Sequence, residues 1–126
     1  MTNLIQTPGD KRPLLEIRDL SARYADGEPV LRHVDLRVMP GEVLGLIGES
    51  GCGKTTLIRC ILRMLPPGAE ILSGEILYAG DVISHRKEKA FARYRGKKIA
   101  YIPQDCGAAM NDYMKIRQIF SEILGR

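Results

Sequence analysis

The sequence predicts an α/β fold, with one domain over residues 14–126 and a flexible leader over residues 1–13. Two observations lead to this prediction. Between residues 42 and 65 an apolar run, a glycine-rich loop and a segment of helical periodicity follow one another, as in an α/β unit. Before that unit, residues 14–24 and 30–38 alternate apolar and polar side chains, which predicts an N-terminal antiparallel β-subdomain. A length of 126 residues suits a single domain.

Composition is that of an ordinary globular protein. Hydrophobic residues make up 44% of the chain and charged residues 27%, which argues against disorder and against a fibrous repeat. The sequence contains neither an apolar run of the roughly 20 residues that a membrane helix needs nor the pattern of a secretion signal at its start. We therefore expect a cytosolic protein. Cys52, Cys60 and Cys106 form no CxxC pair, and reduced thiols are expected in preference to metal ligands or disulfides.

Positive charge is concentrated in one segment. The net charge is +4, yet residues 86–98 hold seven lysines and arginines against one acid, Glu88. Such a run can meet RNA, anionic lipid or an acidic partner, or it can be a solvated helix face. We favour the solvated face, because only Phe91 and Tyr94 interleave as aromatics and no RNA-reading motif accompanies them. No nucleic-acid partner is expected.

The first two elements are strands. In "LLEIRDLSARY" Leu15 and Ile17 alternate with charged residues, and "VLRHVDLRV" alternates again after a turn at Asp26 and Gly27. The leader before them holds Pro8, Gly9 and Pro13 among polar residues. Structure is therefore expected to begin near Leu14, with two antiparallel strands.

The central unit follows the turn at Pro40 and Gly41. "EVLGLI", residues 42–47, is an apolar run that predicts a strand covered on both faces. After the glycine-rich loop, apolar residues recur at helical spacing until Pro66, Pro67 and Gly68 end the helix; they are Leu57, Ile58, Ile61, Leu62 and Leu65.

Four further elements are predicted. "SGEILYAG", residues 73–80, indicates a short strand, and a helix is expected over residues 88–95. "KKIAYIPQD" indicates a strand that ends at Pro103. The last element is an amphipathic helix over residues 116–124, whose apolar residues recur at i, i+3, i+4, i+7 and i+8.

The loop "GESGCGKT", residues 48–55, fits G-x-x-x-x-G-K-[ST] at every fixed position. Glycines allow the backbone amides to form a concave nest for phosphate oxygens, and the following helix adds its positive N-terminal end. In such a P-loop Lys54 can bridge the β- and γ-phosphates and the Thr55 hydroxyl can bind Mg²⁺. Thr56 is expected at the α-phosphate. The alternative is a glycine-rich turn that only reverses the chain.

Together with its flanks, the loop resembles the N-terminal part of an ATP-binding cassette (ABC) ATPase subunit, from about Leu14 to Leu124. The resemblance places Tyr24 as the adenine-stacking aromatic, Val30 as its apolar companion and Gln104 as the Q-loop contact to Mg²⁺ and water. By this resemblance the cofactors are ATP and Mg²⁺, with Thr55 and Gln104 as metal contacts. The nucleotide-contacting residues are then Tyr24, Val30, Gly48, Glu49, Ser50, Gly51, Cys52, Gly53, Lys54, Thr55 and Thr56.

Finer features are similar to the peptide and nickel importer branch. They are "MLPPGAEILSGEILYAGDVIS", "RGKKIAYIPQD" and "AAMN". That branch typically continues its Q-loop as Gln-Asp-Pro and ends it in Asn-Pro, whereas Cys106 and Asp112 stand at the two proline positions here. The resemblance implies uptake of peptides, nickel or a similar solute, at the inner face of the cell membrane. The implied partners are permease membrane subunits and a second ATP-binding subunit.

Three motifs of this family are missing from the 126 residues: an apolar strand ending in Asp-Glu (Walker B), the LSGGQ signature and the H-loop histidine. Residues 72–75, "LSGE", resemble the start of the signature but precede a strand, so they cannot present a helix N-terminus to phosphate. We therefore expect a P-loop NTPase core truncated before the Walker B strand, inactive as an ATP hydrolase by itself.

Two other functions stay open from the sequence. One is a non-catalytic nucleotide-binding or regulatory module that pairs with a full-length subunit. The other is a small P-loop kinase, which phosphate transfer to a nucleoside monophosphate would support. The late position of the P-loop and the segment around Gln104 argue against the kinase.

Overall fold

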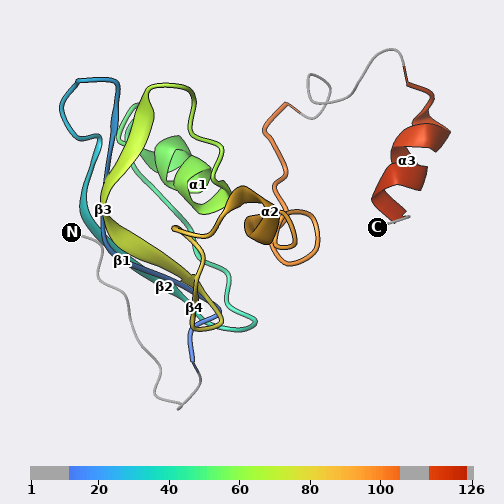
Figure 1. Ribbon diagram of the computed structural model, residues 1–126, viewed down its shortest axis with the longest axis horizontal. Helices are drawn as coiled ribbons and strands as arrows, with labels where there is room; N and C mark the ends of the chain where they lie inside the picture. Colours follow the sequence, from blue (N-terminus) through green and yellow to red (C-terminus); the bar gives the residue numbers. More distant parts are fainter. Residues whose placement is uncertain (1–11, 106–113, 125–126) are drawn as a thin grey trace. The chain divides into compact units, whose positions relative to one another are not determined.

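The computed structural model describes residues 12–105 and 114–124, which belong to two compact units (Figure 1). The first unit, up to Arg86, contains four strands and helix α1, and the second, from Lys87 onward, contains helices α2 and α3. Most of the expected leader, together with Cys106 and Asp112, lies outside the described residues. No helix of the described ranges is long and apolar enough to cross a membrane.

The first unit is built on an antiparallel sheet. β1 (Leu15–Tyr24) pairs on one side with β2 (Leu31–Val38) and on the other with β3 (Ala69–Tyr78). β4 (Asp81–Val82) continues from β3, which gives the order β2-β1-β3-β4. The prediction of an N-terminal antiparallel β-subdomain is thus confirmed. β3 begins four residues earlier than the expected strand at residue 73.

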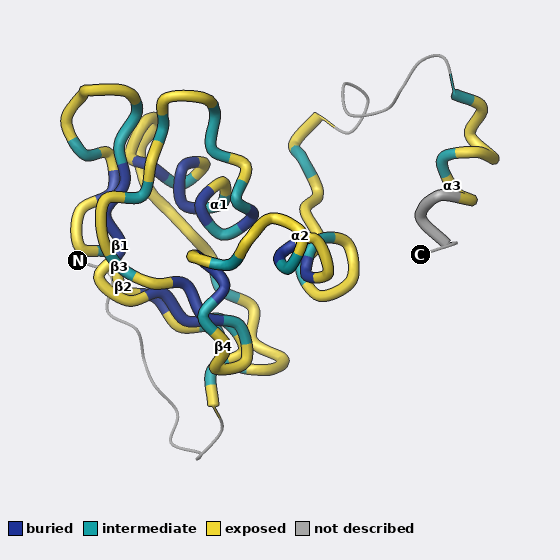
Figure 2. Tube along the Cα trace, in the orientation of Figure 1, coloured by how far each residue is buried: buried dark blue, intermediate teal, exposed yellow. Residues whose placement is uncertain are grey.

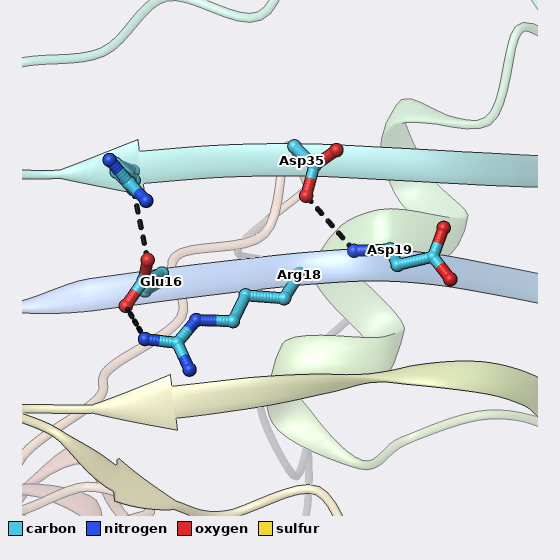
Figure 3. A network of polar contacts seen from close by, with 5 residues as sticks. Glu16, Arg18, Asp19 and Asp35 are labelled. Carbon is cyan, nitrogen blue, oxygen red and sulfur yellow. Dashed lines mark hydrogen bonds and ion pairs between the residues drawn. The ribbon is translucent and has the colours of Figure 1, made fainter.

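A β-bulge interrupts the middle of β1. The register shifts between Ile17 and Leu20 in the pairing with β2 and between Arg18 and Ser21 in the pairing with β3, and Asp19 has a positive φ of 48°. A bulge adds one residue to one strand of a pair, so Ile17 and Leu20 are both buried although they are three positions apart. On the β2 side the bulge is supported by Asp35, whose Oδ1 accepts a 3.0 Å bond from the Asp19 amide (Figure 3). Burial along β1 therefore departs from the simple alternation predicted for it, because Glu16 and Ser21 are buried next to Ile17 and Leu20.

Glu16 is a buried carboxylate held between two arginines. Its oxygens accept a bond of 2.8 Å from Arg18 Nη2 on the same strand (Figure 3) and one of 2.9 Å from Arg37 Nε on β2. The bond from Arg18 lowers the pKa of Glu16 below its ordinary 4.5, against the opposing effect of desolvation. The charged form of Glu16 therefore stabilises the folded sheet.

Glu16→Gln is expected to lower the free energy of unfolding at pH 7 by about 1 kcal/mol, because both arginines lose a charged acceptor. A carboxyl whose pKa is depressed by folding contributes stability above its unfolded pKa, and this contribution is lost as the pH falls through the folded pKa. The variant should therefore lose less stability than the wild-type chain between pH 5 and 3, as measured by urea unfolding at each pH. An identical pH dependence in both proteins would contradict this assignment.

Helix α1 (Lys54–Leu62) lies beside one face of the sheet (Figures 1 and 3). It buries Leu57, Cys60 and Leu62, and the sheet contributes a matching set of buried apolar residues, Ile17, Leu20, Ala22, Leu31, Leu36, Ile76 and Leu77. Figure 2 shows these buried stretches along the strands and the helix. The helix stops at Arg63, which takes a left-handed conformation with φ of 53°, so the predicted helix is three residues too long.

Two predicted strands are absent from the described structure. Residues 42–47 have no strand conformation and leave Val43 97% and Ile47 99% exposed, and residues 98–103 form only a single bridge, between Ile99 and Arg95. A strand exists only where a neighbour supplies its hydrogen-bond partners, and the described part of the chain pairs no strand with residues 42–47. An apolar run predicts burial, but it cannot supply the neighbouring strand with which residues 42–47 would have to pair.

The second unit contains two helices. α2 (Glu88–Phe91) is one turn long, so the helix expected over residues 88–95 is shorter than predicted and ends in turns. Phe91 and Tyr94 are buried and stack with ring centroids 5.9 Å apart, while Arg95 lies over the Phe91 ring. α3 (Ile116–Leu124) confirms the predicted terminal helix over its full length.

Candidate nucleotide-binding site

The glycine-rich loop joins residues 42–47 to the first turn of α1. Gly51 and Gly53 both have positive φ values, 84° and 97°. Gly53 is the N-cap of α1 and supplies no side-chain cap, so no side-chain oxygen bonds the amides of the first turn. A helix start of this kind favours an anionic ligand.

Gly53 also fixes where the loop meets the sheet. A Cβ atom at Gly53 would lie 2.8 Å from Leu31 Cδ2 and 3.4 Å from Val30 Cγ1. These contacts place Val30, the residue just before β2, against the N-terminus of α1. Glycine is needed at position 53 for two reasons: the backbone is left-handed, and the side chains of Leu31 and Val30 approach it closely.

Lys54 bridges the loop with its ammonium group. Lys54 Nζ donates hydrogen bonds of 2.7 Å to the carbonyl oxygens of Gly48 and Glu49 and lies 3.3 Å from Cys52 Sγ. The lysine therefore reaches back over the loop that precedes it, where its charge is held by neutral acceptors. An incoming phosphate would offer the same ammonium stronger, charged acceptors.

Tyr24 and Thr56 connect the sheet to the helix. The Tyr24 hydroxyl and Thr56 Oγ1 are 3.0 Å apart, and Thr56 is only 5% exposed. Arg59 Nη1 lies 3.5 Å from the same hydroxyl. Sequence reasoning missed Arg59, although its spacing of three residues from Thr56 puts both on one helix face.

The structure thus brings together Tyr24, Val30 and the loop that begins α1, all within the first unit. Thr55 lies in the first turn of α1 and is exposed, as a ligand to a bound cation must be. Gln104 is also exposed, but it belongs to the second unit, so its contact to a metal stays a prediction. Over the described ranges, no cluster of three histidine, cysteine or carboxylate side chains could hold a metal ion.

The two described cysteines differ in environment. Cys52 is exposed in the loop, whereas Cys60 is completely buried on α1, and burial raises the pKa of the Cys60 thiol from 9.0 to about 11. Both are thiols in the structure.

Alkylation at pH 8 is expected to modify Cys52 rapidly and Cys60 only when the chain unfolds. The raised pKa alone lowers the thiolate fraction of Cys60 about a hundredfold relative to an ordinary thiol, and burial blocks access in addition. Peptide mapping by mass spectrometry, with and without urea in a Cys106→Ser background, measures both sites. Equal rates at Cys52 and Cys60 without urea would contradict the packing of α1.

An antiparallel sheet followed by a P-loop and its helix is the arrangement of the ABC ATPase domain, and a family comparison agrees with it. The chain belongs to the ABC transporter family, whose profile matches residues 31–119. The resemblance inferred from the sequence, and the fold class predicted from it, are therefore confirmed.

Individual relatives point the same way. The chain is 38% identical over 117 residues to the peptidoglycan transport ATP-binding protein YejF of Agrobacterium fabrum, a match that covers 90% of this chain and 21% of that protein. It is 37% identical over 117 residues to the oligopeptide transport ATP-binding protein OppF of Streptococcus mutans, covering 90% of this chain and 36% of that protein. The chain thus spans between about a fifth and about a third of these relatives.

A solved structure shares the architecture. A bacterial Atm1-family ABC exporter with ATP bound matches 68% of this chain and 14% of its own, with a TM-score of 0.57 and 25% sequence identity.

Proposed function

We propose that this chain is the ATP-binding portion of an ABC importer and binds Mg-ATP at the N-terminus of α1. The observation that carries the proposal is the position of Lys54, whose ammonium lies across the loop from an uncapped helix N-terminus. A cation and a set of helix amides at one place suit the phosphates of a nucleotide. Tyr24, bonded to the same helix, suits the base.

The residues present fit Mg²⁺ only in company with phosphates. Thr55 can supply one hydroxyl ligand, and Mg²⁺ takes its remaining ligands readily from phosphate oxygens and water. Gln104 is proposed as a second protein contact to the metal on the family resemblance alone. Bound Mg²⁺ would neutralise phosphate charge, and Lys54 and the α1 amides would orient the phosphates.

The solute is proposed to be a peptide or a similar small molecule, because relatives are named for peptidoglycan, dipeptide and oligopeptide transport. By the same reasoning the chain works at the inner face of the membrane with permease subunits and a second ATP-binding subunit. Co-purification of the tagged chain with a coexpressed permease tests this partnership.

Calorimetric titration tests the nucleotide proposal. ATP with Mg²⁺ is expected to bind the 126-residue chain, whereas adenosine, which lacks phosphates, is expected to show no measurable binding. No phosphate release is expected, since the 126 residues contain no Asp-Glu strand end. Equal binding of ATP and adenosine would contradict a phosphate site, and release of phosphate would contradict the expected inactivity.

A further inference from the structure

The segment that follows the sheet, residues 87–98, presents a set of exposed cations, and we call it the basic segment. Its one acid, Glu88, accepts a 2.6 Å bond from Arg95 Nη1. The other cations are exposed and form no ion pair with a carboxylate of the described residues; they are Lys87, Lys89, Arg93, Lys97 and Lys98. Within the described ranges, five positive charges in twelve residues are therefore not neutralised.

The backbone of the basic segment is folded. In α2 the Phe91 amide donates to the Lys87 carbonyl at 3.0 Å. After α2 the amides of Lys98 and Ile99 both donate to the Tyr94 carbonyl, at 2.9 and 2.8 Å. Phe91 and Tyr94 are 0% and 6% exposed, and their rings stack. The cations thus lie on a folded loop, seen after α2 in Figure 1, so little backbone order has to be gained when they meet a partner.

We propose that the basic segment contacts the anionic lipid head groups of the membrane. This inference rests on the proposed function, which puts the chain at the inner face of a membrane. Anionic lipids give such a surface a negative potential that attracts clusters of lysine and arginine. The inference adds the bilayer itself to the proposed partners of the chain.

The kind of cation favours lipid over an acidic protein. Carboxylates at fixed positions are bound best by the planar fork of arginine, whereas lysine is a hydrated point charge that requires no fixed geometry. Four of the five exposed cations are lysines. The fifth, Arg93, lies over the Tyr94 ring, 5.6 Å from its centroid. A fluid layer of head groups suits lysines, because the lipids can move to meet them.

The aromatic residues argue against a nucleic acid. Proteins that bind single strands combine cations with exposed aromatic rings, on which successive bases stack. The basic segment contains two aromatic residues, Phe91 and Tyr94, and both are buried. Its surface therefore offers charge without a stacking platform, which is enough for a lipid surface.

Vesicle sedimentation with the 126-residue chain tests the inference. Vesicles of phosphatidylcholine alone are compared with vesicles in which about a quarter of the lipid is the anionic phosphatidylglycerol. At low salt the wild-type chain is expected to partition at least about tenfold more strongly onto the anionic vesicles. This preference should disappear at about 0.5 M salt, where charges are screened within a few ångströms. Binding to the neutral vesicles measures any apolar contribution.

Two matched variants place the contact. Lys97→Gln with Lys98→Gln removes two charges from the basic segment and should lower partition onto the anionic vesicles about 25-fold, because each basic residue near such a surface contributes about fivefold. The control, Arg12→Gln with Arg32→Gln, removes the same net charge from exposed positions of the first unit. It should change partition about twofold or less, since salt screens charges away from the contact.

A second variant of the basic segment guards against a folding defect in the first. Lys87→Gln with Lys89→Gln removes two charges at the start of the segment and should lower partition as much as the pair at residues 97 and 98. It carries the test if that pair does not fold. Both variants are expected to keep the ATP affinity of the wild-type chain.

Several results would overturn the inference. One is equal partition of the wild-type chain onto neutral and anionic vesicles, and another is an equal loss in the control and in the variants of the basic segment. Polyglutamate and a short single-stranded RNA, added at the same concentration of charge as the anionic lipid, should release little of the bound chain. Release of most of it by either one would assign the basic segment to an acidic protein or to a nucleic acid instead.

The outcome for lipid can be told apart from the outcome for nucleotide. A chain that binds ATP but shows no preference for anionic vesicles would contradict this inference alone. A chain that prefers anionic vesicles but binds no ATP would contradict the proposed function and leave the lipid contact standing.

Discussion

Lys54→Ala is expected to lower the affinity for Mg-ATP by about a hundredfold or more. In the structure the ammonium bonds two neutral carbonyls, those of Gly48 and Glu49, and phosphate oxygens would replace them with charged acceptors. Hydrogen bonds to charged groups contribute about 1.5–3 kcal/mol each, so the loss of two is enough for this effect. Calorimetric titration with ATP measures it.

Lys98→Ala is the control, because Lys98 is exposed and lies outside the loop. It removes the same charge from the chain and should leave ATP affinity within about twofold, because salt screens the charge of an exposed side chain that makes no contact in the loop. Urea unfolding of Lys54→Ala separates lost binding from lost structure. An ATP affinity in Lys54→Ala equal to that of Lys98→Ala would remove the P-loop from the site.

Gly74→Ala is expected to have the largest effect on stability, a loss of about 2–4 kcal/mol in the free energy of unfolding. Gly74 lies in β3 with φ of 90°, and a Cβ atom there would be 2.5 Å from the carbonyl oxygens of both Arg18 and Asp19. The backbone of the β1 bulge cannot move away without breaking the pairing of two strands. The strain of the left-handed backbone and the overpacking therefore both lower the free energy of unfolding. Urea unfolding followed by circular dichroism measures the loss.

Gly80→Ala isolates the steric part of this effect. Gly80 has nearly the same φ, 89°, but a Cβ atom there would meet nothing within 4 Å. Alanine at Gly80 should therefore cost only the backbone strain, about 1 kcal/mol. Equal losses for the two variants would contradict the close approach of β3 to the bulge.

The close approach at Gly74 also accounts for the glycine within residues 72–75, the segment that resembles a signature motif by sequence. In the structure they lie within β3, paired with β1, whereas the sequence placed them before a strand. They begin no helix, as expected. The glycine is required there by the neighbouring bulge at Asp19, which no local pattern in β3 reveals.

Much of the fold follows from local chemistry alone. The alternation in β1 and β2, the turn at Gly27 and the helical spacing after Lys54 concern residues close in sequence, and each of these elements is present, although α1 ends three residues early and β1 carries a bulge. The P-loop could be located for the same reason, since its spacing is a local requirement of phosphate binding.

Residues 42–47 show that local sequence alone does not decide whether a strand forms. Their apolar character predicts a buried strand, yet the structure leaves Val43 and Ile47 almost fully exposed. A helix satisfies its backbone hydrogen bonds within itself, whereas a strand depends on another strand that can lie far away in sequence. The helix at residues 116–124 could therefore be predicted from its own residues, and a strand over residues 42–47 could not.

The sequence by itself determined the P-loop, the family, the first two strands and the terminal helix, because each depends on residue types at short spacing. Only the tertiary structure decided that β1 bulges at Asp19, that Gly74 packs against this bulge, and that Thr56 turns inward to bond Tyr24. The contacts of Gly74 and Thr56 join residues 32 to 56 positions apart, so their geometry is set by how the sheet and α1 pack and by nothing in the local pattern.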